Sequence, residues 1–136
     1  MELLKSMKIA ASGLRAQSGR MRVISENLAN ADSTATQKGG EPYRRRISTF
    51  KQIFDREISS TVVSTGRIKA DMSEFGSRFD PGHPAADDKG YVLTPNVNTL
   101  VESMDMREAQ RSYQANLNVI SSTRRMLART LDILRA

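Results

Sequence analysis

The chain has 136 residues, a formal net charge of +6, no cysteine and an aromatic content of 5%. The lack of cysteine excludes a disulfide framework, a thiol nucleophile and a thiolate metal site. A hydrophobic content of 38% argues against a large self-contained core. The first residues contain no sustained apolar run, and no segment approaches the ~18 apolar residues of a membrane span. We therefore expect neither a cleaved signal peptide nor direct membrane insertion.

Positive charge is spread along the chain, with opposite charges interspersed throughout. Arg44-Arg45-Arg46 is the only tight basic cluster. Nucleic-acid binders usually concentrate basic residues on one face or arm, so the sequence argues against nucleic acid as a partner. We expect the three arginines to lie on a solvated or intersubunit face.

Residues 3–29 are predicted to form the first helix, because Leu, Ala, Met, Lys, Arg and Gln dominate this segment. Two rows of residues recur every seven positions, which is typical of a narrow seam for helix–helix contact. The rows are Met7, Leu14, Met21, Leu28 and Leu3, Ala10, Gln17, Ile24. Gln17 is either an imperfection in this seam or a determinant of pairing register. The helix is expected to stop near Asn30, where cap and turn residues follow.

Small residues gather on the first helix and allow two interpretations. Gly13 and Gly19 are either tolerated helix defects, or Gly13 belongs with the alanines at 10, 11 and 16 to a surface that a neighbouring backbone approaches closely.

The four prolines all lie between residues 42 and 95, which favours a helix–insert–helix organisation. Residues 31–42 are predicted to be a loop, residues 43–75 to form two to four short strands, and residues 80–95 to be an irregular, mostly extended connection. His83 lies near Asp87 and Asp88, but this spacing matches no metal motif, so we expect solvated loop residues. The sequence predicts no metal, no cofactor and no catalytic group.

The last helix is predicted to begin near Thr99, since Thr99 and Glu102 have capping-box spacing, and to run almost to the C-terminus. Its seam consists of Met106, Tyr113, Leu117, Ile120, Leu127, Leu131 and Leu134, with Arg124 as a second polar residue at a seam position. A helix this long with a narrow stripe cannot bury itself alone. We expect a marginal isolated monomer whose folding is completed by assembly.

Two stretches of the first helix, Ser12–Gln17 and Ile24–Ala31, resemble the N-terminal signature of the axial proteins of the bacterial flagellum. The run Asn27-Leu28-Ala29-Asn30 is its most recognisable part. Further stretches narrow the resemblance to the basal-body rod proteins, and among them to those of the proximal rod. They are Pro42–Arg45, Asp80–Asp87, Gly90–Val92, Pro95–Asn98 and Met104–Asn116.

This resemblance implies a structural subunit, and no enzyme, of the periplasmic rod that transmits torque from the motor ring to the hook. It implies export through the flagellar type III apparatus without a cleaved signal peptide. The implied partners are other rod subunits, copies of the same chain and the export apparatus. The two terminal helices would form an inner domain, residues 1–30 and 96–136, and residues 31–95 an outer region.

We accordingly predict a mainly α fold, in which the long terminal helices pair as an antiparallel coiled coil and carry a small β-rich or irregular central insert. We also expect arginines on the outer faces of the helices to pair with carboxylates of adjacent subunits; these are Arg15, Arg22, Arg111, Arg125 and Arg129. The main alternative is a coiled-coil adaptor or chaperone of a secretion system. A basic nucleic-acid binder comes next, and an enzyme is the least favoured.

Overall fold

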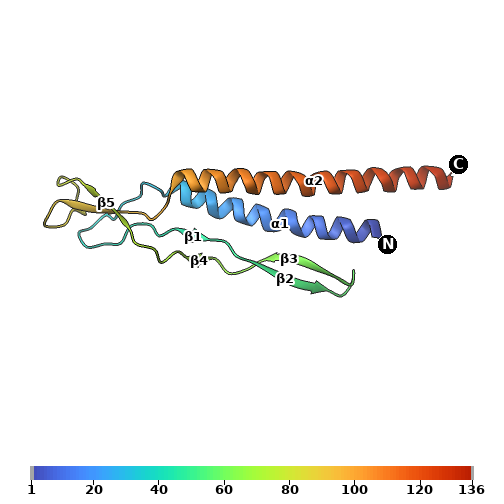
Figure 1. Ribbon diagram of the computed structural model, residues 1–136, viewed down its shortest axis with the longest axis horizontal. Coiled ribbons are helices and arrows are strands. Elements are labelled where there is room, and N and C mark those ends of the chain that lie inside the picture. Colours follow the sequence, from blue (N-terminus) through green and yellow to red (C-terminus); the bar gives the residue numbers. More distant parts are fainter. Residues whose placement is uncertain (1, 136) are drawn as a thin grey trace. The chain divides into compact units, whose positions relative to one another are not determined.

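The computed structural model describes residues 2–135, which form two helices and six strands (Figure 1). The elements are α1 (Glu2–Ala29), β1 (Arg46–Ile47), β2 (Phe50–Asp55), β3 (Ser60–Thr65), β4 (Lys69–Ala70), β5 (Gly76–Phe79), β6 (Tyr91–Thr94) and α2 (Thr99–Arg135). The strands pair as three separate two-stranded antiparallel ladders: β1 with β4, β2 with β3, and β5 with β6. Neither helix combines the length and apolarity that crossing a membrane requires, within the described residues.

The prediction of a mainly α fold is wrong, because helices hold 49% of the residues and strands hold 18%. The terminal helices are present, but the middle of the chain is organised by β pairing. Residues 80–95 also differ from the irregular connection expected there, since Tyr91–Thr94 forms β6 and pairs with β5. Val92 in this strand is only 1% exposed. A four-residue strand between prolines gives too short an alternation for the pattern to reveal.

The helix boundaries follow from local sequence. The first helix was predicted over residues 3–29, and α1 differs from this range by one residue at its start. The last helix was predicted to begin near Thr99, and α2 begins at that residue. The predicted capping box is wrong, because Asn98 is the N-cap: its Oδ1 accepts hydrogen bonds from the backbone N–H of Leu100 (3.0 Å) and Val101 (3.2 Å). The Glu102 carboxylate is instead engaged by Asn27 and Arg45.

The chain divides into two compact units. Within the described residues, the first unit contains residues 2–21, Ser48–Arg67 and 107–135, and the second unit contains Arg22–Ile47 and Ile68–Met106. The N-terminal helix, the central segment and the C-terminal helix each contribute to both units.

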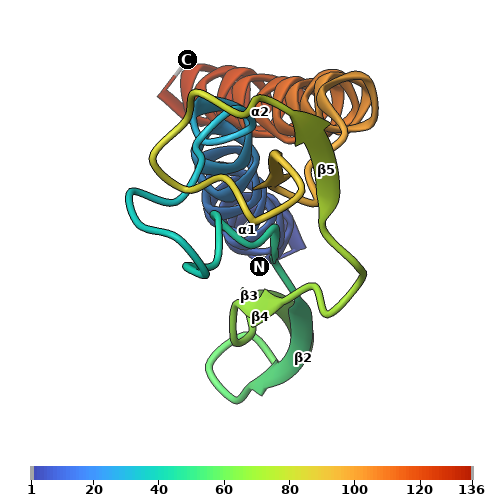
Figure 2. The ribbon, with the colours of Figure 1, turned by 90° about the vertical axis from the view of Figure 1, so that its left-hand side faces the viewer.

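In the first unit, α1 lies between α2 and the β2–β3 hairpin (Figures 1 and 2). The hairpin pairs in full register from Phe50 opposite Thr65 to Asp55 opposite Ser60. It is attached to α1 through Ser12, whose Oγ accepts a hydrogen bond from the backbone N–H of Val63 at 3.4 Å. Both long faces of α1 are therefore covered in this unit, which explains why its buried residues spread beyond one narrow stripe.

The second unit contains the last turns of α1, the first turns of α2 and the ladders β1–β4 and β5–β6. Its buried residues include Asn27 and Glu102, both 1% exposed, besides Val92 and Ala85. The rings of Phe79 and Tyr91 pair edge to face across β5 and β6, with centroids 5.3 Å apart. The interior of this unit therefore combines a small apolar cluster with buried polar groups.

Candidate assembly site

The α1 and α2 helices run antiparallel in the first unit. Gly13 lies opposite Asn116, and Arg20 forms an ion pair with Glu108 at 3.2 Å, so residue numbers fall along α2 as they rise along α1. The predicted seam residues of α1 lie on its covered side. Ala10 is 4% and Ile24 is 5% exposed, and the others are half-buried: Leu3, Met7, Leu14, Gln17, Met21 and Leu28.

The predicted seam of α2 divides into two groups. Half-buried positions recur every seven residues and form one row, consisting of Met106, Tyr113, Ile120 and Leu127. The other predicted residues are exposed, with fractions of 38% for Leu117, 56% for Leu131 and 77% for Leu134. The large apolar side chains of α2 therefore lie partly on its covered side and partly on its surface.

The second covered row of α2 consists of small and polar residues. Ala109 is 0% exposed and Thr123 is 6% exposed, and the half-buried Asn116 lies midway between them. The sequence interpretation missed this row because it considered large apolar residues only. The signal was available in the seven-residue spacing, which Glu102 also follows.

Close approach of the two helices depends on a glycine. A Cβ placed on Gly13 would lie 2.8 Å from Nδ2 of Asn116, closer than real Cβ atoms come to their neighbours. The Asn116 amide is itself held by a hydrogen bond from Nδ2 to the carbonyl of Ser112 at 3.0 Å. Gly13 therefore makes room for the side chain of Asn116 on α2. The interpretation that the small residues let a neighbouring backbone come near stays a prediction.

Gln17 has an unusual position on the covered side of α1. Its Oε1 is buried and accepts no hydrogen bond from the described residues. Such an atom carries a desolvation cost in the folded chain. The prediction that Gln17 sets pairing register stays a prediction.

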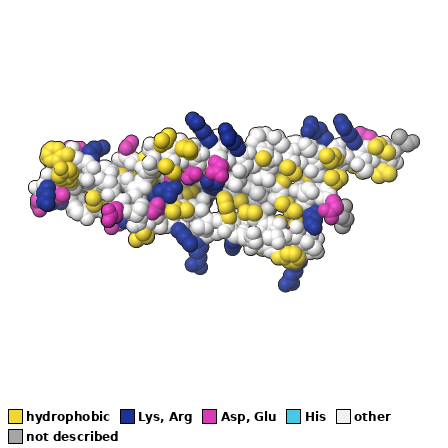
Figure 3. Space-filling model, in the orientation of Figure 1, with side chains coloured by type: hydrophobic (Ala, Val, Ile, Leu, Met, Phe, Trp, Pro, Cys, Tyr) yellow, Lys and Arg dark blue, Asp and Glu magenta, His cyan; other side chains and the backbone are white. Residues whose placement is uncertain are grey.

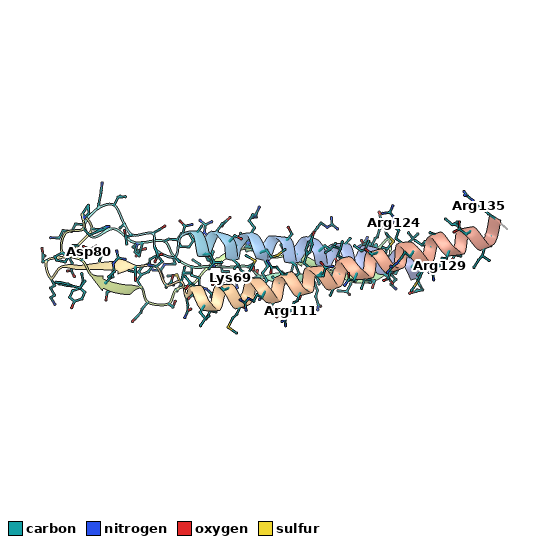
Figure 4. The ribbon with its side chains drawn as sticks, turned by 90° about the horizontal axis from the view of Figure 1, so that it is seen from above. Lys69, Asp80, Arg111, Arg124, Arg129 and Arg135 are labelled. Atoms are coloured by element: carbon teal, nitrogen blue, oxygen red, sulfur yellow. The ribbon has the colours of Figure 1, made fainter. Side chains whose placement is uncertain are left out.

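The outer surface of the helices is basic. The part of α2 in the first unit, residues 107–135, contains six arginines and two acidic residues. Figure 4 shows Arg111 and Arg129 along one edge of α2, and Arg124 and Arg135 along the other. All five arginines predicted to make intersubunit contacts are exposed, including Arg15 and Arg22 on α1 and Arg125 on α2.

Asn27, from the Asn-Leu-Ala-Asn run, is the centre of a buried hydrogen-bond network in the second unit. Its Oδ1 accepts from the backbone N–H of Arg46 and from the Tyr43 hydroxyl, both at 2.9 Å. Its Nδ2 donates to the Arg46 carbonyl at 2.8 Å and to Oε2 of Glu102 at 3.1 Å. These four hydrogen bonds use the two donors and two acceptor positions of the amide, so Asn27 joins the end of α1, the start of α2 and strand β1.

The guanidinium of Arg45 extends this network. Its Nε donates to Oε1 of Glu102 at 2.6 Å, and its terminal nitrogens lie 3.3 Å from Asp71 and 3.8 Å from Asp105. Burial alone would lower the pKa of Arg45, but the carboxylates of Glu102 and Asp71 outweigh it and raise that pKa above its usual value. The side chain of Arg45 therefore stays charged and ties β1 to α2.

All three arginines of the basic cluster make contacts inside the second unit. Arg46 is nevertheless exposed, as expected, whereas Arg44 and Arg45 are half-buried; an intersubunit role of this face stays a prediction. Besides Arg45, Arg44 donates to the carbonyls of Asp71 and Ser73 and lies over the Phe75 ring at 4.1 Å. Arg46 forms an ion pair with Glu26 at 3.3 Å. The sequence alone could not assign these contacts, since they join segments far apart along the chain.

His83 is half-buried rather than solvated. Its Nδ1 accepts from the backbone N–H of Ala85, and its Nε2 lies 3.0 Å from Oγ1 of Thr34. Because Nδ1 accepts, Nε2 carries the proton in the neutral ring and donates to Thr34. The described residues contain no group of three or more side chains suited to hold a metal ion.

The chain matches two families of flagellar proteins. The family described as "Flagella basal body rod protein" matches residues 7–35, and the one described as "Flagellar basal body rod FlgEFG protein C-terminal" matches residues 88–133. These two matched regions contain most of α1 and α2, the helices that form the antiparallel pair.

Curated relatives cover nearly the whole chain. The flagellar basal-body rod protein FlgC of Agrobacterium fabrum is 48% identical over 134 residues, which are 98% of this chain and 96% of the relative. FlgC of Escherichia coli strain CFT073 is 41% identical over 138 residues, with 98% of each chain covered. FlgC of Bacillus subtilis is 38% identical over 148 residues, 98% of this chain and 99% of the relative. These similarities confirm the resemblance of the sequence, and the chain belongs to the FlgC family of flagellar basal-body rod proteins.

Proposed function

We propose that this protein is assembled into the proximal part of the flagellar rod by contacts between the helices of neighbouring subunits, and that it transmits torque from the motor ring to the hook. Its membership in the family makes it a structural component of the basal-body rod. The observation that carries the proposal is the 48% identity to a rod protein over nearly the full chain.

The surface of α2 supports assembly through this helix. Leu100, Met104 and Ile133 are 70%, 63% and 76% exposed, although all three are large and apolar. Apolar residues left exposed in such numbers along one helix are typical of a protein–protein interface. Neighbouring subunits of the rod, including copies of this chain, would cover them. The exposed arginines of α1 and α2 would pair with carboxylates of those neighbours.

We further propose that the chain reaches the periplasm through the flagellar export apparatus without losing its N-terminus. It then acts without nucleic acid, cofactor or catalysis. Narrow helical faces that are completed only in the assembly would let the subunit travel unfolded and order itself on docking. We also propose that the terminal helices form an inner domain of the assembled rod and that the central segment forms an outer region.

Purification of hook–basal bodies from a strain that carries an epitope-tagged chain tests the location. The tagged chain should co-purify with the basal body, and deletion of its gene should abolish swimming. Recovery of the tag only outside the basal body would contradict the proposed function.

The helix faces are tested by Leu117→Asp and Ile120→Asp. Each variant should still be secreted, while swimming should be lost because a charge enters an apolar contact. Charge reversal at Arg111 or Arg125 should impair swimming more mildly, since exposed ion pairs contribute little individually. Normal swimming in both aspartate variants would refute assembly through the part of α2 that contains Leu117 and Ile120.

A further inference from the structure

An apolar groove lies on the first unit, between the start of α1 and the tip of the β2–β3 hairpin. Its volume is about 800 Å3, and its apolar lining residues are Leu4, Met7, Ala11, Ile58 and Ile120. Four charged residues also line it: Glu2, Lys5, Lys8 and Glu57. Lys8 and Glu57 form an ion pair that joins α1 to the hairpin. A groove of this size holds several side chains.

The last two turns of α2, residues 128–135, carry a matching surface. At 100° per residue, Leu131, Ile133 and Leu134 share one half of the helix, and the charged residues Arg129, Asp132 and Arg135 share the other. The three apolar side chains are 56%, 76% and 77% exposed. Figure 3 shows hydrophobic side chains on the surface at this end of the molecule. The segment is therefore an amphipathic helix end with an uncovered apolar half.

We propose that residues 128–135 of one copy of this chain dock into the groove of a second copy. A helix that places an apolar face into a hydrophobic groove is a recurrent mode of protein recognition. The arginines and the aspartate of the segment can pair with the acidic and basic residues that line the groove. This inference rests on the proposed function, because it names one of the contacts by which subunits would assemble.

The segment cannot enter the groove of its own chain. The groove contains Ile120, and α2 continues as one uninterrupted helix from there to Arg135. A rise of 1.5 Å per residue places Leu134 about 21 Å further along the axis. The occupant must therefore be the helix end of another molecule.

The groove and the helix end are different surfaces of the chain, so the contact is heterologous. Each copy can bind the helix end of one neighbour in its groove and insert its own helix end into the groove of another. Such a contact need not close into a ring. This suits a helical assembly, and it makes a specific prediction for mixtures of variants.

Two variants of the full-length chain test the contact by sedimentation. The helix-end variant carries Ile133→Gln and Leu134→Gln, and the groove variant carries Leu4→Gln, which changes a residue that is 56% exposed. Gln is a good helix former, so circular dichroism should show unchanged helix content. The wild-type chain should self-associate as its concentration rises. Each variant alone should associate at least about tenfold more weakly.

Mixing the two variants gives the decisive result. The intact helix end of the groove variant should enter the intact groove of the helix-end variant, which yields a one-to-one dimer that neither variant forms alone. Met72→Gln is the matched control, since it alters an apolar residue that is 78% exposed and belongs to neither helix, and it should associate like the wild type.

Three results would overturn the docking contact. They are a wild-type chain that stays monomeric up to its solubility limit, a mixture without dimer, and loss of association only in the helix-end variant, which would indicate pairing of two helix ends. None of them bears on the presence of the chain in purified hook–basal bodies. Absence from basal bodies would overturn the proposed function instead.

Discussion

At the scale of single residues, Gly13 is where helix propensity and packing conflict. Alanine would favour the helix by about 1 kcal/mol over glycine, yet the space that a Cβ would need at Gly13 is taken by the amide of Asn116. A glycine inside a 28-residue helix therefore marks a close contact in this fold, rather than a tolerated defect.

The first prediction concerns this contact. Gly13→Val should lower the free energy of unfolding by about 1–3 kcal/mol, because the larger side chain forces Asn116 or the whole helix aside. Adding Asn116→Ala should recover at least about 1 kcal/mol, since it empties the space. Urea denaturation of both proteins measures this. Ser18→Val, at an exposed position of α1, should cost only a few tenths of a kcal/mol. Equal losses at the two positions would contradict the close contact.

Asn27 is the second residue whose loss should be severe. Asn27→Ala should lower the free energy of unfolding by about 2–4 kcal/mol, because it leaves the Tyr43 hydroxyl and backbone groups of Arg46 without a partner. Asn30, in the same sequence run, donates mainly to the carbonyl of Glu26 one turn earlier. Asn30→Ala should therefore cost about 1 kcal/mol or less. The order of the two losses in urea denaturation decides whether Asn27 is the centre of the network.

Stability should fall in acid because of Asp71. Hydrogen bonds from Ser73, and then the charge of Arg45, hold the pKa of the Asp71 carboxyl below its ordinary value. The ionised form is thus favoured by folding, and its contribution is present above the unfolded pKa of about 3.9 and lost as the pH falls through the lower folded pKa. Thermal midpoints should decline below about pH 4, and Asp71→Asn should flatten this decline. Parallel curves for variant and wild type would exclude the assignment.

At the scale of elements, the sequence predicted the helices better than the strands. Both helices have long, proline-free segments with seven-residue periodicity, and their predicted first residues lie within one residue of the observed ones. The ladders β1–β4 and β5–β6 consist of strands of two and four residues. Such strands leave almost no alternation to detect, and their partners lie far along the chain.

The same difference applies to the candidate site. The covered row of Met106, Tyr113 and Ile120 followed from its apolar character. The contacts of Arg45 with Glu102 and Asp71 could not be predicted, because each is an ordinary surface residue type whose burial depends on the tertiary fold.

The start of α2 gives a prediction at this scale. Asn98→Ala should destabilise the protein by about 1 kcal/mol, because the N–H groups of Leu100 and Val101 lose their acceptor. Thr99→Ala should have a smaller effect, which would distinguish the observed cap from the capping box expected by sequence. Thermal unfolding followed by circular dichroism measures both variants. A larger loss for Thr99→Ala would refute the assignment of Asn98.

At the scale of the whole molecule, the chain is a structural subunit of the basal-body rod whose fold leaves many apolar groups exposed on α2. Its composition already suggested a limited core. The 77% exposure of Leu134 now shows one place where contacts remain to be made. Stability of the free subunit should consequently depend on concentration, with a thermal midpoint that rises with protein concentration as subunits associate.

Each unit draws on the beginning, the middle and the end of the polypeptide. During synthesis or any end-first passage, the first unit cannot form before residues 107–135 are available, and the second unit cannot form before Met106 is available. The many contacts between distant residues delay folding until the last helix is available. Neither unit can therefore be completed from the first half of the polypeptide alone.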